Sequence, residues 1–223
     1  MRAKESNSGN EMKKSMAVAC LFAAMSAVAD TSPVMVSLLT PVQAPSRDYD
    51  VTGFRLSLLY GACCEFAGLD ISVVGYAGGD LTGLSVGGVN VAGGRMCGGQ
   101  VGLVNWSNSG ETSWGGRSVG AQIGALNYAG TFCGLQDGVV NVSATSFAGL
   151  EVGLVNCARD LYGVQCGSWL ILGVNFAAGT VYGCQLGLVN YARRMEKGVQ
   201  IGIVNVIADN GWLPVLPLIN GGF

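Results

Sequence analysis

A short motif, G-x-Q-x-G-x-x-N-x-A, recurs along almost the whole chain and constrains its fold more than any other feature. The motif is complete at residues 183–192, and close copies occupy 98–105, 149–156 and 198–205. A repeat of this length is one supersecondary unit that cannot bury its apolar residues alone and must pack against the next copy. The sequence therefore predicts a repeat protein.

Ten copies of the unit align on their first glycine, which we call the anchor glycine. The anchors are Gly53, Gly68, Gly83, Gly98, Gly120, Gly134, Gly149, Gly163, Gly183 and Gly198. Degenerate copies at 33–40 and 213–220 flank these ten, so the sequence predicts twelve units. Most units follow one another at a nearly constant spacing, whereas the first, fifth and ninth connections are longer, as between Gly98 and Gly120.

Each unit has the pattern of a β-strand. In unit 198–205, the apolar residues Val199, Ile201 and Ile203 recur with a period of two, which is typical of a half-buried strand. Glycine-rich segments such as 78–80 separate the units and indicate turns. No helical periodicity occurs after the first thirty residues. The predicted class is therefore all-β, with about twelve short strands at a period of about 14–15 residues.

Two all-β architectures fit this pattern. Each unit is either one strand and a tight turn of an antiparallel meander, or one coil of a parallel β-solenoid. The three long connections recur every four units and, in a meander, emerge at the same end. This grouping favours a closed antiparallel barrel or three-sheet prism, which removes exposed strand edges, and the β-solenoid is the alternative. Pro214 and Pro217 argue against closure, because proline in a sheet is expected on an edge strand.

Glycine also occupies the fifth place of most units. These fifth-place glycines are Gly87, Gly102, Gly124, Gly138, Gly153, Gly187 and Gly202. A glycine inside a strand indicates a bend, a bulge or a close approach of another group. We therefore expect Gly153→Val or Gly187→Val to destabilise the fold, although valine has the higher β-propensity.

The first thirty residues indicate export. Two lysines precede an apolar, small-residue run at 15–28 that leads into an A-x-A cleavage site. The run is shorter than the roughly 20 residues that a membrane-spanning helix needs. We predict a signal peptide at 1–29, in which 1–11 is an upstream extension, and a single β-repeat domain at 30–223.

Seven of the eight cysteines follow the predicted signal peptide. With no C-x-x-C motif and no histidine, the chain gives little support to a zinc site. Export makes disulfides possible, and small buried cysteines are the other interpretation. In the antiparallel meander, Cys184 lies at one end of the strands and five other cysteines lie at the opposite end. Any disulfide is therefore expected to join two of those five and to exclude Cys184. The five are Cys63, Cys64, Cys97, Cys133 and Cys157.

No residue pattern supports catalysis. Ser85 lies in a G-x-S-x-G sequence that matches a nucleophile elbow by letter, but it belongs to one copy of the repeat, and the chain has no histidine to act as its base. Asp70, Asp137 and Glu151 form no recurrent acidic pair. We therefore predict that the protein is not an enzyme and has no catalytic, metal-binding or cofactor-binding residues. The net charge of -2 gives no footprint for nucleic acid.

Glutamine and asparagine recur at fixed places of the unit. They are Gln100, Gln122, Gln136, Gln165, Gln185, Gln200, Asn90, Asn105, Asn127, Asn141, Asn156, Asn190 and Asn205. We expect these side chains to satisfy backbone groups at turns and strand ends, and a sugar site is the alternative.

Aromatic residues lie near the strand ends. They are Tyr76, Trp106, Tyr128, Phe176 and Tyr191 after the apolar run, and Phe132, Phe147, Tyr162 and Tyr182 before it. In a membrane protein they would form an interfacial girdle, and in a soluble fold they would plug the ends of the core.

The G-L-V-N segments at 102–105, 153–156 and 187–190 resemble a family of bacterial surface repeat proteins whose units read G-[VL]-Q-[IL]-G-[LI]-V-N. The resemblance covers roughly 33–220 and implies an envelope or surface location. We expect a non-enzymatic β-repeat protein at or in the outer membrane, with a structural or interaction role. Its expected partners are outer-membrane or cell-surface components, and its ligand is unknown. The alternative is a soluble periplasmic or secreted module that binds carbohydrate or protein.

Overall fold

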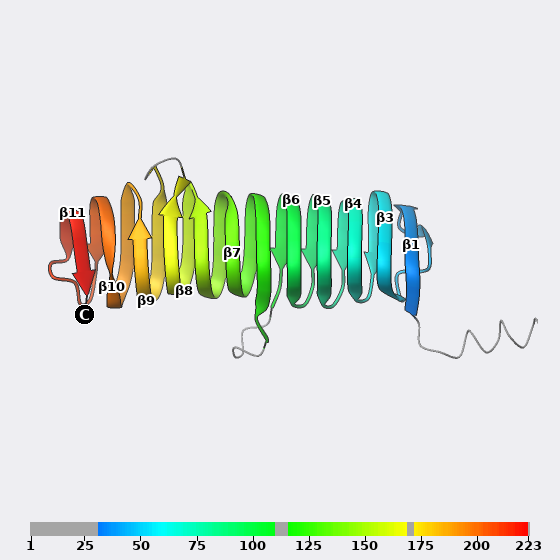
Figure 1. Ribbon diagram of the computed structural model, residues 1–223, viewed down its shortest axis with the longest axis horizontal. Coiled ribbons are helices and arrows are strands. Elements are labelled where there is room, and N and C mark those ends of the chain that lie inside the picture. Colours follow the sequence, from blue (N-terminus) through cyan, green and yellow to red (C-terminus); the bar gives the residue numbers. More distant parts are fainter. Residues whose placement is uncertain (1–30, 110–115, 169–171, 223) are drawn as a thin grey trace, which may run out of the picture.

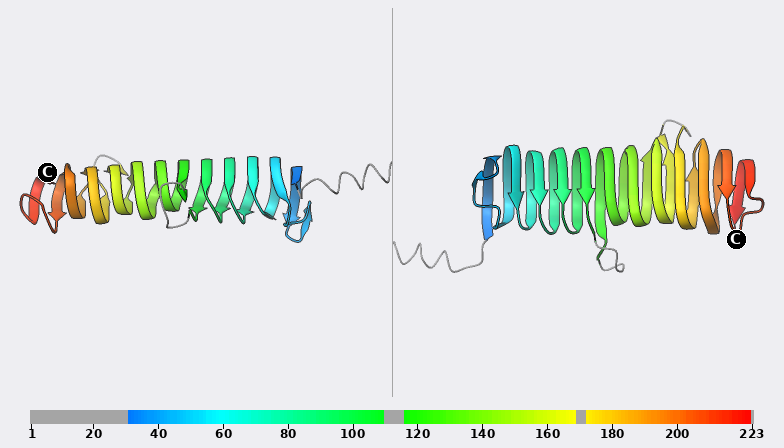
Figure 2. Two further views of the ribbon diagram at one scale, coloured as in Figure 1. Left: turned by 90° about the horizontal axis from the view of Figure 1, so that it is seen from below. Right: turned by 180° about the vertical axis from the view of Figure 1, so that it is seen from behind.

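The protein is an all-β parallel solenoid of about 11 turns, seen here in a computed structural model. The structure describes residues 31–109, 116–168 and 172–222. The coils stack in a single row, with the N-terminal coils at one end of the long axis and the C-terminal coils at the other (Figures 1 and 2). The predicted signal peptide at 1–29 lies outside the described residues.

The strands of the described chain form one continuous sheet. They are β1 (Thr31–Leu39), β2 (Val42–Ala44), β3 (Asp50–Cys63), β4 (Phe66–Ala77), β5 (Leu81–Ala92), β6 (Met96–Ser107), β7 (Ser118–Gly153), β8 (Val155–Gly167), β9 (Val174–Leu186), β10 (Val189–Ile207) and β11 (Val215–Gly222). Their order in space is β11-β10-β9-β8-β7-β6-β5-β4-β3-β1-β2. The pairs from β1–β3 to β9–β10 are parallel. At the two ends of the sheet, β2 and β11 run antiparallel to their neighbours.

The prediction of a closed antiparallel barrel or three-sheet prism is therefore wrong, and the alternative, a β-solenoid, is confirmed. Successive units pair in parallel and in register, so that Gly68 lies beside Gly83, and Gly83 beside Gly98. One unit of the repeat is thus a full coil. The last predicted unit, at 213–220, does not continue the coil, because β11 reverses direction against β10. Pro217 accordingly lies on an edge strand.

The ten anchor glycines all have a positive φ, between 116° and 158°. Glycine reaches this backbone conformation easily, whereas residues with a Cβ are strained in it. There is also no room for a side chain, since a Cβ on Gly98 would collide with the carbonyl oxygen of Gly83 in the preceding coil. The repeat keeps glycine here because adjacent coils touch backbone to backbone.

Four positions of each coil point into the solenoid. In the coil at 81–95 they are Leu81, Ser85, Asn90 and Ala92, all fully buried. The positions of Leu81 and Ala92 form the apolar core in most coils. Its members are Val51, Phe66, Leu81, Met96, Phe132, Phe147, Leu161, Val181 and Met195 at the first position, and Cys63, Ala77, Ala92, Ala129, Ala158, Ala177, Ala192 and Ile207 at the second. The other two positions carry polar side chains that hold the coils together.

The asparagines at the Asn90 position form an unbroken ladder of hydrogen bonds. Each side-chain nitrogen donates to the asparagine oxygen of the next coil at 2.7–2.9 Å, through Asn90, Asn105, Asn127, Asn141, Asn156, Asn175, Asn190 and Asn205. In most coils the same amide also donates to a main-chain carbonyl of the next coil, as from Asn90 to Val101 at 3.1 Å. Because a buried amide needs its partners, each asparagine fixes the register of two coils.

Glutamines at the other polar position, two residues after the anchor, form a second ladder that points the opposite way. The ladder consists of Gln100, Gln122, Gln136, Glu151, Gln165, Gln185 and Gln200. Gln122 donates to Gln100 at 2.8 Å, and Gln136 donates to Gln122 at 2.7 Å, so the donors face the N-terminal end. Gln122 also donates to the Tyr128 carbonyl across its own coil at 3.2 Å. This second bond ties the two sides of a coil together.

A buried ion pair replaces the glutamines in the early coils. Arg55 and Asp70 occupy the glutamine position in consecutive coils and are fully buried. The guanidinium donates to the carboxylate at 2.8 and 2.6 Å and to the Tyr76 carbonyl at 2.9 Å, and it lies 4.8 Å from the centroid of the Phe66 ring. Such complete pairing is what allows two charges to remain inside a protein.

We predict that Gly187→Val lowers the thermal stability of the protein. A Cβ at this fifth-place glycine would lie 2.6 Å from the side-chain nitrogen of Asn175 and 2.7 Å from the Gly173 carbonyl oxygen. Valine would therefore displace an amide of the asparagine ladder. We expect a loss of about 1–3 kcal/mol in unfolding free energy, as for other overpacked sites, measured by circular dichroism melting.

The matched control is Gly99→Val, which introduces the same side chain into another strand. A Cβ at Gly99 would approach the flexible end of Leu84 at 3.0 Å and otherwise only the Ala121 carbonyl oxygen at 4.0 Å. We expect this variant to melt close to the unchanged protein. A midpoint for Gly187→Val equal to that of the control would contradict the close approach.

Candidate functional site

Charged side chains gather along one long edge of the solenoid, which we call the charged edge. It is formed by the turns between coils, such as 78–80 and 93–95, which line the lower side of Figure 1. Its residues are Asp50, Glu65, Asp80, Arg95, Arg117, Arg159, Asp160, Arg193, Arg194, Glu196, Lys197 and Asp209. Among the other exposed charges of the described chain, Arg47 and Asp48 lie in the loop before β3, and Asp137 lies on a strand.

The opposite edge follows the corner in the middle of each coil, beside the fifth-place glycine, and we call it the apolar edge. Its exposed side chains are Leu58, Leu59, Val73, Leu103, Val139, Leu154, Leu172, Leu188, Ile203 and Leu218. Leu103 is 69% exposed. Two hollows lie along this edge, one of about 390 Å³ beside Leu58 and Val73 and one of about 290 Å³ between Leu188 and Leu218. A continuous exposed apolar patch marks an interaction surface.

Aromatic side chains border the charged edge on both sides. Tyr162 and Tyr182 follow the turns on one strand segment, and Tyr76, Trp106, Tyr128, Phe176 and Tyr191 precede the turns on the other. Rings in adjacent coils stack, with centroid distances of 3.8 Å for Trp106–Tyr128 and 5.4 Å for Tyr162–Tyr182. We call these rings the aromatic columns. The other two aromatics predicted at strand ends, Phe132 and Phe147, are core residues instead.

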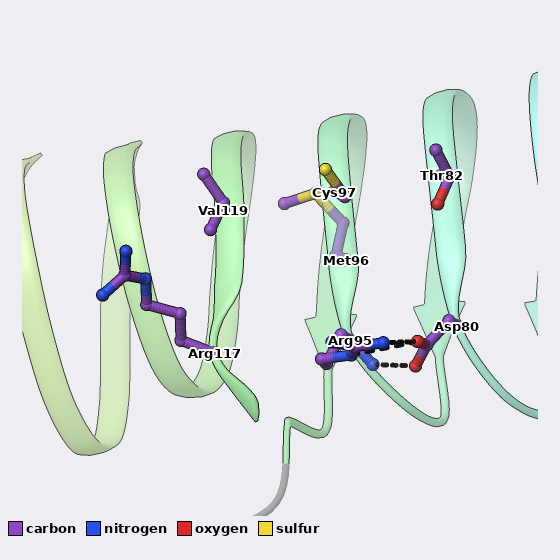
Figure 3. Close-up of a pocket in the computed structure, with 7 residues that line it drawn as sticks. All are labelled: Asp80, Thr82, Arg95, Met96, Cys97, Arg117 and Val119. Atoms are coloured by element: carbon purple, nitrogen blue, oxygen red, sulfur yellow. Dashed lines mark hydrogen bonds and ion pairs between the residues drawn. The ribbon is translucent and has the colours of Figure 1, made fainter. Parts of the chain in front are cut away.

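A hollow of about 340 Å³ lies on the charged edge (Figure 3). Arg95 donates to one carboxylate oxygen of Asp80 at 3.0 and 2.6 Å. Partial burial raises the pKa of Asp80, but the hydrogen bonds and charge of Arg95 outweigh it and hold this pKa below its ordinary value. In Figure 3 the thiol of Cys97 lies well away from the Asp80 carboxylate. The residues that line this hollow therefore provide no paired nucleophile and base.

The residues considered for chemistry are buried or far apart. Ser85 is fully buried, and its hydroxyl lies 2.8 Å from Asp70, which is itself paired with Arg55. Glu151 lies inside the glutamine ladder, whereas Asp137 is exposed. The repeated glutamines and asparagines are fully buried and donate to backbone carbonyls in many coils. These side chains do satisfy backbone carbonyls as predicted, but their main partners are the amides of adjacent coils, which the prediction did not include. They are fully buried and line no sugar site.

The seven described cysteines are free thiols. Their predicted grouping at one end of a meander is wrong, because all coils run in the same direction and have no alternating ends. Cys97 and Cys133 instead lie immediately before the anchor glycine of their coils, whereas Cys157 lies in register with Phe176 and Cys184 with Val164. Each cysteine thus occupies an ordinary place of the repeat unit, and none of the seven is paired in a disulfide.

Sequence reasoning missed the apolar edge. Its signal is a break in the period of two, where two apolar residues follow the fifth-place glycine directly, as in Leu103-Val104 and Val139-Val140. An alternating strand would bury one residue of each pair. At a corner both point outward, and none of the four is buried.

No protein-family model, curated protein or solved structure matches the chain. Across the described ranges, no helix is long and apolar enough to cross a membrane. The same ranges contain no group of three or more His, Cys, Asp or Glu side chains arranged to hold a metal ion.

Glu151 occupies a glutamine place inside the ladder. It accepts a hydrogen bond from Gln165 at 2.6 Å, and the Ser143 hydroxyl lies 3.3 Å from Glu151 and 3.2 Å from the Gln136 oxygen. That hydroxyl has one hydrogen to donate. An ionised Glu151 takes the hydroxyl hydrogen of Ser143, whereas a protonated Glu151 can donate to Ser143 and leave that hydrogen for the Gln136 oxygen. Only the protonated form therefore completes the ladder. Burial, opposed by the bonds from Gln165 and Ser143, raises the pKa of Glu151 to about 8.

We predict that Glu151→Gln removes a pH dependence of stability. The ordinary pKa of 4.5 applies to the unfolded chain and a pKa of about 8 to the folded one. Between these values the folded state holds a proton that the unfolded state has lost, so stability falls as the pH rises toward 8. The loss is on the order of a few kcal/mol. Chemical unfolding from pH 4.5 to 9 should show this slope in the unchanged protein and not in Glu151→Gln.

Asp137→Asn is the control for loss of one carboxylate, because Asp137 is exposed on a strand. This variant should keep the slope of the unchanged protein between pH 4.5 and 8. Equal slopes in all three proteins would show that Glu151 is ionised in the fold at neutral pH.

Proposed function

We propose that the chain is a non-enzymatic protein of the bacterial cell envelope, at or in the outer membrane or at the cell surface, with a structural or interaction role. The division of its surface into a charged edge and an apolar edge carries this proposal. Isolated exposed apolar residues are normal in soluble proteins, but a row of them along a whole domain is not. The predicted signal peptide at 1–29 and the resemblance to bacterial surface repeat proteins point to the same compartment.

The absence of a chemical pair at the described surface supports a non-enzymatic role. Ser85, Asp70 and Glu151 are enclosed by the solenoid, and a buried group that no cavity reaches cannot meet a substrate. The polar side chains that recur from coil to coil are taken up by the two ladders. The side chains that remain on the described surface are suited to binding and not to catalysis.

The alternative, a soluble secreted carbohydrate-binding module, has weaker support. Sugar rings pack on the faces of aromatic side chains, but Trp106 and Tyr128 turn their faces to each other at 3.8 Å. The same holds for Phe176 and Tyr191 at 4.8 Å. Stacking along the axis leaves the ring edges outward, which is a poor platform for a sugar.

Fractionation of a bacterial host that expresses the full chain tests the proposal. We expect the protein in the outer-membrane fraction after a high-salt wash, with an N-terminus at Asp30 after cleavage behind Ala29. Salt removes proteins held by surface charge, whereas burial of apolar side chains resists it.

Recovery of the uncleaved chain from the cytoplasm would contradict export. Recovery of the cleaved chain from the periplasm or medium as a soluble monomer without detergent would favour the binding module instead.

A further inference from the structure

The charged edge and the apolar edge run along the solenoid on opposite sides, and the aromatic columns lie between them in part of the coils. About 11 turns stacked at about 4.8 Å each make an edge about 50 Å long. Rings of the aromatic columns follow the charged edge in several coils, and mainly aliphatic side chains come next and continue around the apolar edge. Asp137, directly before the fifth-place Gly138, is an exposed charge among these aliphatic side chains. This order, from charge through Tyr and Trp to aliphatic residues, is that of a protein surface that passes from water into lipid.

We infer that the apolar edge inserts into one leaflet of a phospholipid bilayer, with the solenoid axis parallel to the membrane plane. The aromatic columns then lie at the headgroups, and the charged edge remains in water. This inference rests on the proposed envelope function and names the partner of the apolar edge as lipid.

The width of a coil fits one leaflet. The first strand segment of the coil at 81–95 runs from Leu81, beside the charged edge, to Val86, beside the corner. Six extended residues span about 17 Å, and half of the hydrocarbon core of a bilayer is about 15 Å thick. The corner therefore reaches the depth of one leaflet and does not cross the membrane.

The backbone at the apolar edge is paired from within, which is the condition for contact with lipid. Most coils from Asn90 onward turn the corner just after a carbonyl that the asparagine ladder satisfies, as Asn105 does for Ile123 at 2.9 Å and Asn190 for Ile201 at 2.9 Å. The main-chain ladder continues around the corner, with Val204 donating to Leu188 at 3.0 Å. The corner thus presents side chains to its surroundings while these backbone groups face inward.

Lipid suits this surface better than a second copy of the chain. Exposed apolar residues lie on the first strand segment, for example Leu69, Leu84 and Leu150, as well as on the corner and beyond it at Val174 and Val204. A rigid partner covers one of these sides, whereas acyl chains can surround all three. With a net charge of -2, the protein has no excess of positive charge to draw it to anionic headgroups, so apolar burial must drive insertion.

Flotation of the purified chain 30–223 with vesicles of zwitterionic phosphatidylcholine tests the inference. We expect the unchanged protein to float with the vesicles in high salt as well as in low salt. Leu103→Lys should lower its partition into vesicles about tenfold or more, because a lysine in hydrocarbon is costly. Ile203→Lys should do the same near the other end of the edge. Both side chains are largely exposed, at 69% and 61%, so the fold should tolerate the change.

Ala178→Lys is the matched control, since Ala178 is exposed beside Arg159 at the charged edge. It should float like the unchanged protein, and all variants should keep the same melting midpoint. The inference is overturned if the unchanged protein stays with the soluble fraction, or if Leu103→Lys floats as well as Ala178→Lys. A dimer that Leu103→Lys converts to a monomer, without vesicle binding, would overturn it as well and assign the edge to a second copy. These outcomes leave the envelope location intact, because fractionation in cells tests that location separately.

Discussion

The fold depends on one constraint: the amides buried in each coil bond chiefly to the amides of the coils directly above and below. Asn141 accepts a hydrogen bond from Asn127 and donates one to Asn156, both at 2.8 Å. A shift of one coil by one residue would break both hydrogen bonds. An unpaired buried amide costs about 1–3 kcal/mol, so a slip along the whole ladder would cost more than the fold's net stability. Extra residues are accordingly confined to turns and corners, and the chain returns to register after them.

Departures from the repeat are compensated where they occur. Glu151 replaces a glutamine, and Ser143 replaces the usual alanine in the preceding coil, within reach of both Glu151 and Gln136. Near the N-terminal end, Arg55 and Asp70 form a charge pair where later coils have two amides. The Ser85 hydroxyl lies 2.8 Å from the Asp70 carboxylate and 2.8 Å from the Asn90 side-chain oxygen, and so connects the charge pair to the asparagine ladder. In both places the interior remains polar and paired, which indicates that pairing matters more than the identity of the side chain.

The sequence was sufficient for the class, the unit and ten anchors, because glycine with a positive φ and period-two apolar residues depend on local chemistry. The relative direction of neighbouring strands could not be predicted, because a unit of this length can form either one strand with a turn or one coil with two short strands. The regular spacing of the three long connections favoured the antiparallel barrel, although these connections do not lie at one end of the structure. One holds the β2 hairpin, one follows β6 at the charged edge, and one follows β8 at the apolar edge. The sequence indicated a bend or close approach at Gly187. It did not show that this bend is a corner that exposes Leu188, because the corner exists only when the coils stack in parallel.

The antiparallel strands at both ends have a consequence for growth. A stack of identical coils presents at each end the template for another coil, and uncapped stacks of this kind extend into fibres. Here β11 turns back on β10, and its Pro217 has no N–H to offer an incoming strand. At the other end the three-residue β2 covers part of β1 between Pro41 and Pro45. The antiparallel strands thus cover edges of the first and last coils on which a further parallel coil would otherwise pair.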